Sequence, residues 1–184
     1  MTIHSLVARL SELGPASIGY GPKHPQHPQP ELAPMLEEFL ATYPFLRKDQ
    51  GYIEFLETCA GASVIDAGEE DRVMLDIAGF TQVSTNLATW DFEVPVVDEE
   101  GYYSFASGVY TLSDRGMHYD GISIGGCFDS TGTRKWGVYR SVQGSTPEEF
   151  TRYWYCDTFE EWLWAILEYK GRLPDHHPKF GIGD

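Results

Sequence analysis

Cysteine, long apolar runs and basic residues are all scarce in this chain. Cysteine occurs only three times, an odd number without a C-x-x-C pair, so we expect reduced thiols and not a disulfide framework. No apolar run approaches the roughly 20 residues that cross a bilayer. The first residues also lack the basic and apolar regions of a secretory signal. The sequence therefore predicts a cytoplasmic protein that makes no use of a membrane.

Lys and Arg total 13 against 28 Asp and Glu, which gives a formal net charge of −15. The acids are concentrated in residues 49–100, where Arg72 is the single base. Such a field opposes binding to nucleic-acid phosphates or anionic membranes and favours a basic protein partner. The alternative interpretation is that these acids only solvate the surface. If the field serves binding, the candidate partner-binding acids are Glu69, Glu70, Asp71, Asp98, Glu99 and Glu100.

Catalytic and metal-binding signatures are also missing. The chain has no H-E-x-x-H, no G-x-S-x-G, no Walker loop and no G-x-G-x-x-G. His24 and His27 lack further ligands at metal-binding spacing, and so does the pair His176-His177. Cys156 directly precedes a predicted helix, whose N-terminus can lower a thiol pKa, but no histidine partner is evident. We therefore predict no catalytic residue, no metal and no cofactor.

Two amphipathic helices bracket the middle of the chain. Apolar residues recur at helical spacing over 49–61 and again over 157–171. Asp157 is placed to cap the second helix, and Gly171 suits its left-handed end. Trp164 lies off the apolar face of this helix, so it either anchors an interface or covers the end of a sheet. The apolar positions are Tyr52, Phe55, Leu56, Cys59 and Ala60 in the first helix, and Phe159, Trp162, Leu163, Ile166 and Leu167 in the second.

The N-terminal region divides into a helix and a connector. Residues 2–13 have a helical apolar pattern, whereas residues 14–30 contain five prolines and three glycines. We therefore expect residues 1–30 to form a helix appended to the main fold through a connector over 14–30, which is either extended across the surface or partly mobile. Another helix is predicted over 32–43, packed antiparallel to the helix at 49–61. The remaining division is a domain over 31–172 and a tail over 173–184.

Between the bracketing helices the apolar period becomes two, which is typical of strands. Because no helix separates these strands, most neighbours should be antiparallel. The sequence thus predicts an α+β fold, with a mixed, largely antiparallel sheet flanked by N-terminal helices and one C-terminal helix. The expected strands are 62–66, 72–77, 82–92, 103–112, 118–124, 135–142 and 153–156, with a tight turn at 129–132.

Several of these segments together resemble the SUKH superfamily of Smi/Knr-like proteins. Glu38-Phe39-Leu40, Tyr43-Pro44-Phe45-Leu46 and the run from Tyr52 to Leu56 ending in Ala60-Gly61 are similar to the family's N-terminal helices. Thr158-Phe159-Glu160-Glu161-Trp162-Leu163 is similar to its final helix. The resemblance covers roughly residues 32–170 and implies an α+β fold.

The resemblance also implies a function. Many bacterial members are immunity proteins that bind a cognate toxin, often a nuclease, whereas the yeast members act as regulatory interaction hubs. We therefore expect a non-catalytic protein-binding module, an immunity protein that neutralises a basic toxin. The alternatives are a regulatory scaffold of the Smi/Knr type and a small hydrolase or transferase. The oligomeric state stays open.

Overall fold

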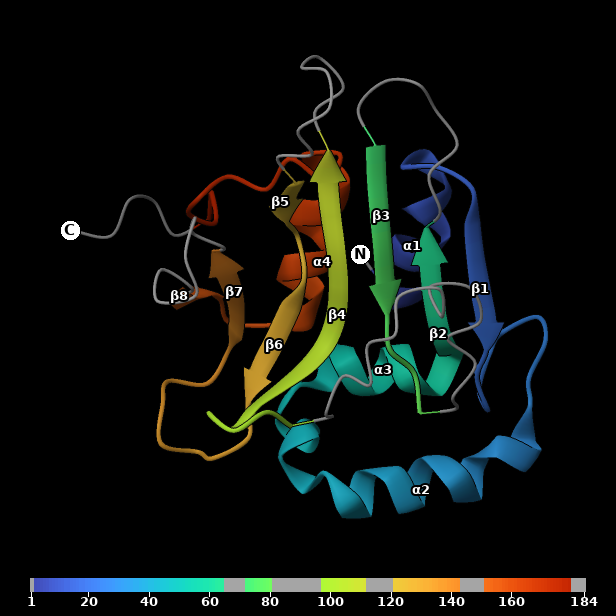
Figure 1. The fold of residues 1–184 in the computed structure, drawn as a ribbon. Helices are drawn as coiled ribbons and strands as arrows, with labels where there is room; N and C mark the ends of the chain where they lie inside the picture. The colour runs from blue at the N-terminus through green and yellow to red at the C-terminus, as the bar shows by residue number, and fades with distance from the viewer. Residues whose placement is uncertain (1, 65–71, 81–96, 112–120, 143–150, 180–184) are drawn as a thin grey trace.

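The computed structural model describes residues 2–64, 72–80, 97–111, 121–142 and 151–179. Their eight strands form one sheet in the order β1-β2-β3-β4-β6-β7-β8, with β5 paired to β4, and each pairing is antiparallel. This arrangement confirms the predicted α+β class (Figure 1). The strands are β1 (Ala16–Tyr20), β2 (Cys59–Val64), β3 (Arg72–Ile77), β4 (Tyr102–Thr111), β5 (Gly121–Ser123), β6 (Gly126–Asp129), β7 (Val138–Val142) and β8 (Thr151–Cys156).

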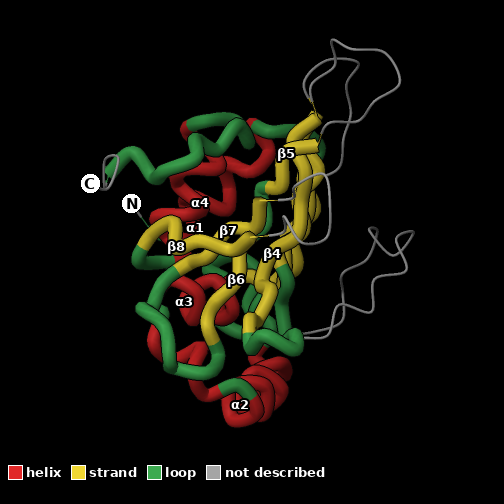
Figure 2. Tube along the Cα trace, turned by 60° about the vertical axis from the view of Figure 1, so that its left-hand side comes forward, coloured by secondary structure: helices red, strands yellow, loops and turns green. Residues whose placement is uncertain are grey.

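Helices α1, α3 and α4 lie on one face of the sheet, and α2 lies below its lower end (Figures 1 and 2). The main core fills the space between these helices and the sheet. Its centre is aromatic: the ring of Phe105 lies 4.6 Å from that of Phe128 and 5.0 Å from that of Trp162. The helices are α1 (Ile3–Ala8), α2 (Ala33–Thr42), α3 (Gln50–Thr58) and α4 (Phe159–Glu168), with short 3-10 helices η1 (Arg9–Glu12), η2 (Pro30–Leu32) and η3 (Pro44–Lys48).

The expectation that the first helix is an appendage is wrong. Its apolar face is buried in the main core, which it shares with α3 and α4. Arg9 also pairs with Glu168 of α4 at 3.0 Å. The connector prediction fails at Ala16–Tyr20, which forms β1. Because β1 is an edge strand, it tolerates the neighbouring prolines that a central strand would not. The buried residues of this region are Ile3, Leu6, Val7 and Leu10.

The two bracketing helices are confirmed, with corrections at one end of each. The first ends at Thr58, and Cys59 and Ala60 belong to β2, where Cys59 pairs with Tyr20 of β1. In the second, Thr158 is the N-cap in place of Asp157, because its hydroxyl accepts a hydrogen bond from the backbone of Glu161. Gly171 has the left-handed conformation expected beyond the helix end, with φ of 81°.

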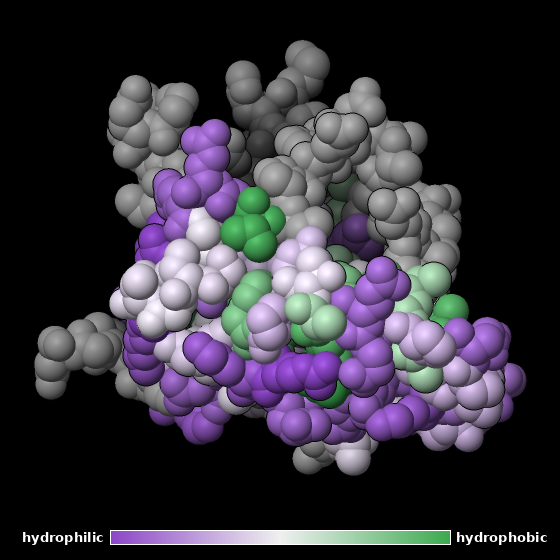
Figure 3. Space-filling view, turned by 90° about the horizontal axis from the view of Figure 1, so that it is seen from below, coloured by the Kyte–Doolittle hydropathy of each residue, from purple (hydrophilic) through white to green (hydrophobic). Residues whose placement is uncertain are grey.

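Most predicted strands correspond to observed ones. The strand expected over 82–92 lies outside the described residues, and β6 was not predicted. All four β6 residues are buried, so this strand lacks the alternation that reveals a half-exposed one. Seen from below, the surface is largely polar with small apolar spots (Figure 3). Within the described residues, no helix combines the length and apolarity needed to span a bilayer.

Candidate functional site

The face of the sheet turned away from α1, α3 and α4 carries a second cluster of side chains. Phe105 and Phe128 point into the main core, so their neighbours on β4 and β6 point to the opposite face. There the rings of Tyr102 and Tyr139 meet edge to face at 5.3 Å. We call this group the outer cluster; it consists of the buried Tyr102, Cys127 and Tyr139 and the half-buried Trp154.

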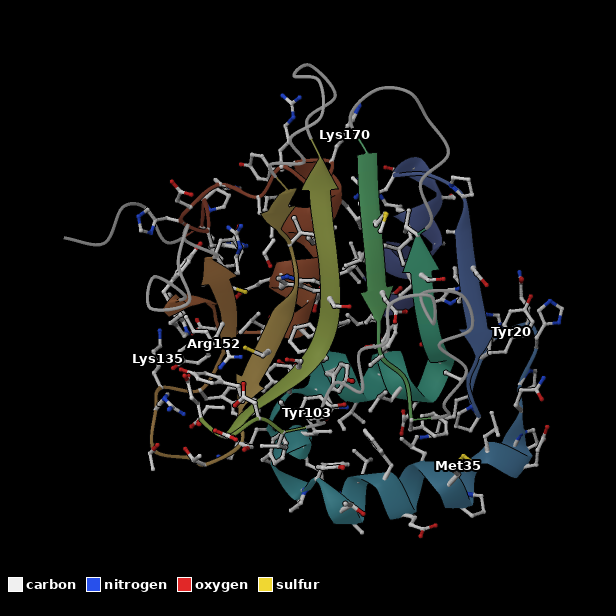
Figure 4. All side chains as sticks on the ribbon, in the orientation of Figure 1. Tyr20, Met35, Tyr103, Lys135, Arg152 and Lys170 are labelled. Atoms are coloured by element: carbon white, nitrogen blue, oxygen red, sulfur yellow. The ribbon has the colours of Figure 1, made fainter. Side chains whose placement is uncertain are left out.

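Three cations cover the outer cluster, and we call them the cationic rim: Arg134, Lys135 and Arg152. The guanidinium carbons of Arg134 and Arg152 lie 4.4 Å and 4.5 Å from the centroid of the Tyr102 ring. Lys135 places its Nζ 3.3 Å from the ring of Trp154. A cation over an aromatic face stabilises the pair by roughly 0.5–2 kcal/mol. Figure 4 shows Lys135 and Arg152 on the β7–β8 side, away from Tyr20 at the β1 edge.

Each rim cation also pairs with an acid. Arg134 contacts Asp129 at 2.8 Å, and Lys135 contacts Asp157 at 3.4 Å. Arg152 pairs with both Asp98 and Glu100. The surface over the outer cluster is therefore a balanced network of opposite charges and not a single-sign patch. Two of the acids that the sequence suggested for partner binding belong to this network.

The three acids at 98–100 have different surroundings. Asp98 folds the turn that leads into β4, because its Oδ1 accepts hydrogen bonds from the backbone N–H groups of Glu100 and Tyr102, at 3.0 Å and 2.9 Å. The Glu100 side chain is 66% exposed although it pairs with Arg152, and Glu99 is exposed. Asp98 is therefore an organising residue, while Glu99 and Glu100 face solvent. The other candidate acids, Glu69, Glu70 and Asp71, lie outside the described residues.

Asp129 holds the loop that presents the rim. It is 1% exposed and accepts hydrogen bonds from the backbone N–H groups of Thr131 and Arg134 and from the hydroxyl of Thr131. Burial alone would raise its pKa, but these bonds and the Arg134 guanidinium outweigh burial and hold the pKa at about 2. The chain bends over 130–134, where the turn at 129–132 was predicted, and Gly132 has a φ of 72°. Asp129 is thus a permanently charged acceptor at neutral pH.

The buried thiols are poorly suited to nucleophilic chemistry. Burial raises the pKa of Cys127 in the outer cluster to about 12. It also raises the pKa of Cys156, and nearby Glu161 adds to the effect. The Cys156 thiol donates to the carbonyl of Thr158 at 3.4 Å. The helix-terminus activation considered for Cys156 is therefore outweighed by desolvation.

Trp164 and the histidines lie elsewhere. Trp164 is half-buried, packs against the main core and has its ring 5.9 Å from the ring of His177. These contacts favour a role in covering the sheet over a role as an interface anchor. His24 stacks on His27 at 5.7 Å, and its Nδ1 accepts two backbone hydrogen bonds. Within the described part of the chain, no group of three His, Cys, Asp or Glu side chains could hold a metal ion.

Sequence reasoning missed the aromatic and cationic members of this site. The sequence signal that could have found them is the strand predicted at 153–156. Alternation along β8 puts Arg152 and Trp154 on one face of the sheet and Tyr153 and Tyr155 on the other. That alternation becomes informative only once the register with β7 is known.

Comparisons of this chain with protein-family models, with curated proteins and with solved structures found no significant match.

Proposed function

We propose that this protein is a non-catalytic binding module that docks a protein partner over the outer cluster and its cationic rim. The observation that carries the proposal is the pre-organised set of Arg134, Arg152, Tyr102 and Trp154. Arg, Tyr and Trp dominate the energetics of protein interfaces, and side chains already fixed by ion pairs lose little entropy on binding.

The ionisation of the site favours binding over catalysis. General acids and bases work best with pKa values near the operating pH. Here the pKa of Asp129 lies near 2, and burial raises the pKa values of Cys127 and Tyr102 further from neutrality. These groups can hold charge or fill space, but they are poor proton carriers at pH 7.

We further propose that the partner is a basic toxin and that the protein acts as its immunity protein in the cytoplasm. The support is the resemblance to SUKH immunity proteins together with the net charge of −15. An acidic inhibitor associates faster with a basic partner because the charges steer the encounter. Asp98 and Glu100 are paired with Arg152, so Glu99 is the better candidate for steering among these three acids. Glu69, Glu70 and Asp71 stay candidates because of their place in the acidic part of the sequence.

The first experiment is affinity capture from the native organism with elution in a salt gradient. We expect one basic polypeptide, whose expression in a test host inhibits growth unless this protein is co-expressed. Capture of several unrelated regulatory proteins, without toxicity or rescue, would contradict the immunity function and favour the regulatory scaffold.

Charge reversal then tests the docking surface. Glu99→Lys changes an exposed acid beside the rim, and Glu38→Lys makes the same charge change at an exposed position of α2. We expect at least a tenfold weaker affinity for the captured basic partner in Glu99→Lys and less than a twofold change in Glu38→Lys. Equal effects of the two substitutions would show that the rim is not the interface.

A further inference from the structure

Arg140 of β7 is a buried cation on the helix-facing side of the sheet. The residue is 3% exposed, and its guanidinium donates to the carbonyl oxygens of Pro174 at 2.7 Å and Ser123 at 3.1 Å. Its Nε atom is buried without a hydrogen-bond partner. Among the acids that the structure describes, none forms an ion pair with Arg140, whereas both arginines of the rim have one. The guanidinium is therefore buried without a direct ion pair to these acids. The one described acid that acts on its surroundings is the exposed Asp175, which adds to the effect of burial in raising the pKa of the neighbouring Tyr153.

Two tyrosines of β8 surround this guanidinium. Tyr153 is the direct cross-strand neighbour of Arg140, and Tyr155 lies two residues further along the same face. The guanidinium carbon is 5.9 Å from the Tyr153 ring and 5.0 Å from the Tyr155 ring. Tyr155 is 2% exposed, and both hydroxyl groups are buried without a hydrogen-bond partner. One small region thus contains three buried donor groups that lack an acceptor.

The chemistry of these groups selects one class of ligand. Buried polar groups are normally hydrogen-bonded, and a cluster of exceptions indicates an ion or water that completes the site. All three groups can donate, and the guanidinium adds a positive charge, so an anion satisfies them whereas a cation is repelled. An anion would also remove the cost of burying an uncompensated charge.

The C-terminal segment covers the same region, which limits the size of the ligand. Leu173 and His177 are buried, the His177 ring packs 5.3 Å from that of Tyr155, and the Pro174 carbonyl accepts from Arg140. We call residues 173–177 the strap. A ligand must enter while the strap is lifted and must be small enough to lie beneath it.

We propose that Arg140, Tyr153 and Tyr155 form a binding site for a small monovalent anion, either a halide or the carboxylate of a short organic acid. The strap closes this site. The anion site lies on the opposite face of the sheet from the outer cluster, so it is separate from the proposed docking surface.

The test uses thermal unfolding of the full chain at constant ionic strength, with a bulky sulfonate replaced stepwise by chloride or by acetate. We expect a saturating rise in Tm with at least one of these anions. Response to acetate alone identifies a carboxylate ligand, and response to chloride identifies a halide ligand. A Tm that is the same in all three salts would overturn the proposal.

Variants separate specific binding from a general salt effect. Tyr155→Phe and Tyr153→Phe each remove one hydroxyl without altering the ring, and we expect each to weaken the anion's apparent affinity about tenfold, close to the effect of one charge-assisted hydrogen bond. Tyr20→Phe alters an exposed tyrosine of β1, at the opposite edge of the sheet from β8, and should leave the affinity unchanged. An affinity equal to that of the wild type in all three variants would overturn the site.

Crystals grown in sodium bromide provide a direct view. We expect an anomalous peak within hydrogen-bond distance of Arg140 Nε or a tyrosine hydroxyl, and its loss in Tyr155→Phe. A water at this position, or bromide only on the outer surface, would contradict a halide site; in that case the proposal stands only if the acetate response is positive.

Discussion

One carboxylate connects Asp49 to Phe159 across 110 positions of the sequence. Asp49 Oδ1 accepts from the backbone N–H of Tyr52 at 2.9 Å and so caps α3. Its Oδ2 accepts from the backbone N–H of Phe159, also at 2.9 Å, at the start of α4. Burial raises the pKa of Asp49, and the hydrogen bonds from these backbone groups lower it. A single buried side chain thus fixes the first turns of two helices relative to each other.

Replacing Asp49 by Asn should therefore destabilise the fold. An amide nitrogen cannot accept a hydrogen bond, so one of the two backbone groups is left unpaired, and the free energy of unfolding should fall by about 1–3 kcal/mol. Urea unfolding at pH 7 measures this change. Asp175→Asn, at an exposed acid, is the control and should change stability by less than about 0.5 kcal/mol. Equal stability of the two variants would contradict the linking role.

The ionisation of Asp129 should make the stability of the fold depend on pH. Its pKa in the folded protein is about 2, below the ordinary value of 3.8. Its ionised form therefore contributes stability above about pH 4, and the contribution is lost as the pH falls towards 2. This difference between the ordinary pKa and the folded-state pKa of Asp129 corresponds to roughly 2 kcal/mol of folding stability. The stability gap between the wild type and Asp129→Asn should narrow by that amount between pH 6 and pH 2.5; a gap independent of pH would rule out this coupling.

The three thiols should be unreactive in the folded protein. Cys59, Cys127 and Cys156 are all buried, and burial raises each pKa, that of Cys127 to about 12. At pH 8 a thiol with that pKa is ionised in only about one molecule in 10,000. A disulfide-exchange reagent should therefore label the native protein slowly and label all three thiols in urea. Rapid labelling of Cys156 in the native protein would contradict this prediction and support the alternative of a small hydrolase or transferase.

The N-terminal helix should be required for stability. Leu6 is fully buried in the main core, so Leu6→Ala leaves a cavity and should cost about 2–5 kcal/mol. Ala8→Ser changes an exposed position of the same helix and serves as the control. Thermal and urea unfolding of the two variants make the comparison. Equal stabilities would mean that α1 is dispensable, as an appendage would be.

The local elements were largely predictable because their signal is local. The apolar positions of α4, from Phe159 to Leu167, mark one helix face in any context. Cys59 and Ala60 were misplaced because a buried strand can continue the apolar pattern of a preceding helix without a break. The burial of Leu6 depends on α3 and α4, which are remote in sequence, so no local pattern reports it.

The candidate site was less predictable because it depends on register. The acids at 98–100 stand out in the sequence, but the pairing of Asp98 and Glu100 with Arg152 requires β4 and β8 to be placed across two intervening strands. Arg140 illustrates the same difficulty, since neither Ser123 nor Pro174 is a neighbour in sequence.

The contact between α1 and α4, which lies beside the ion pair between Arg9 of η1 and Glu168, has a consequence during synthesis. The first helix leaves the ribosome long before its packing partner has been translated, so its apolar face stays uncovered while most of the chain emerges. Because domains complete folding only when their long-range partners are present, the native core closes only after α4 has emerged. Until then, the exposed apolar face of this helix makes the incomplete chain prone to aggregation.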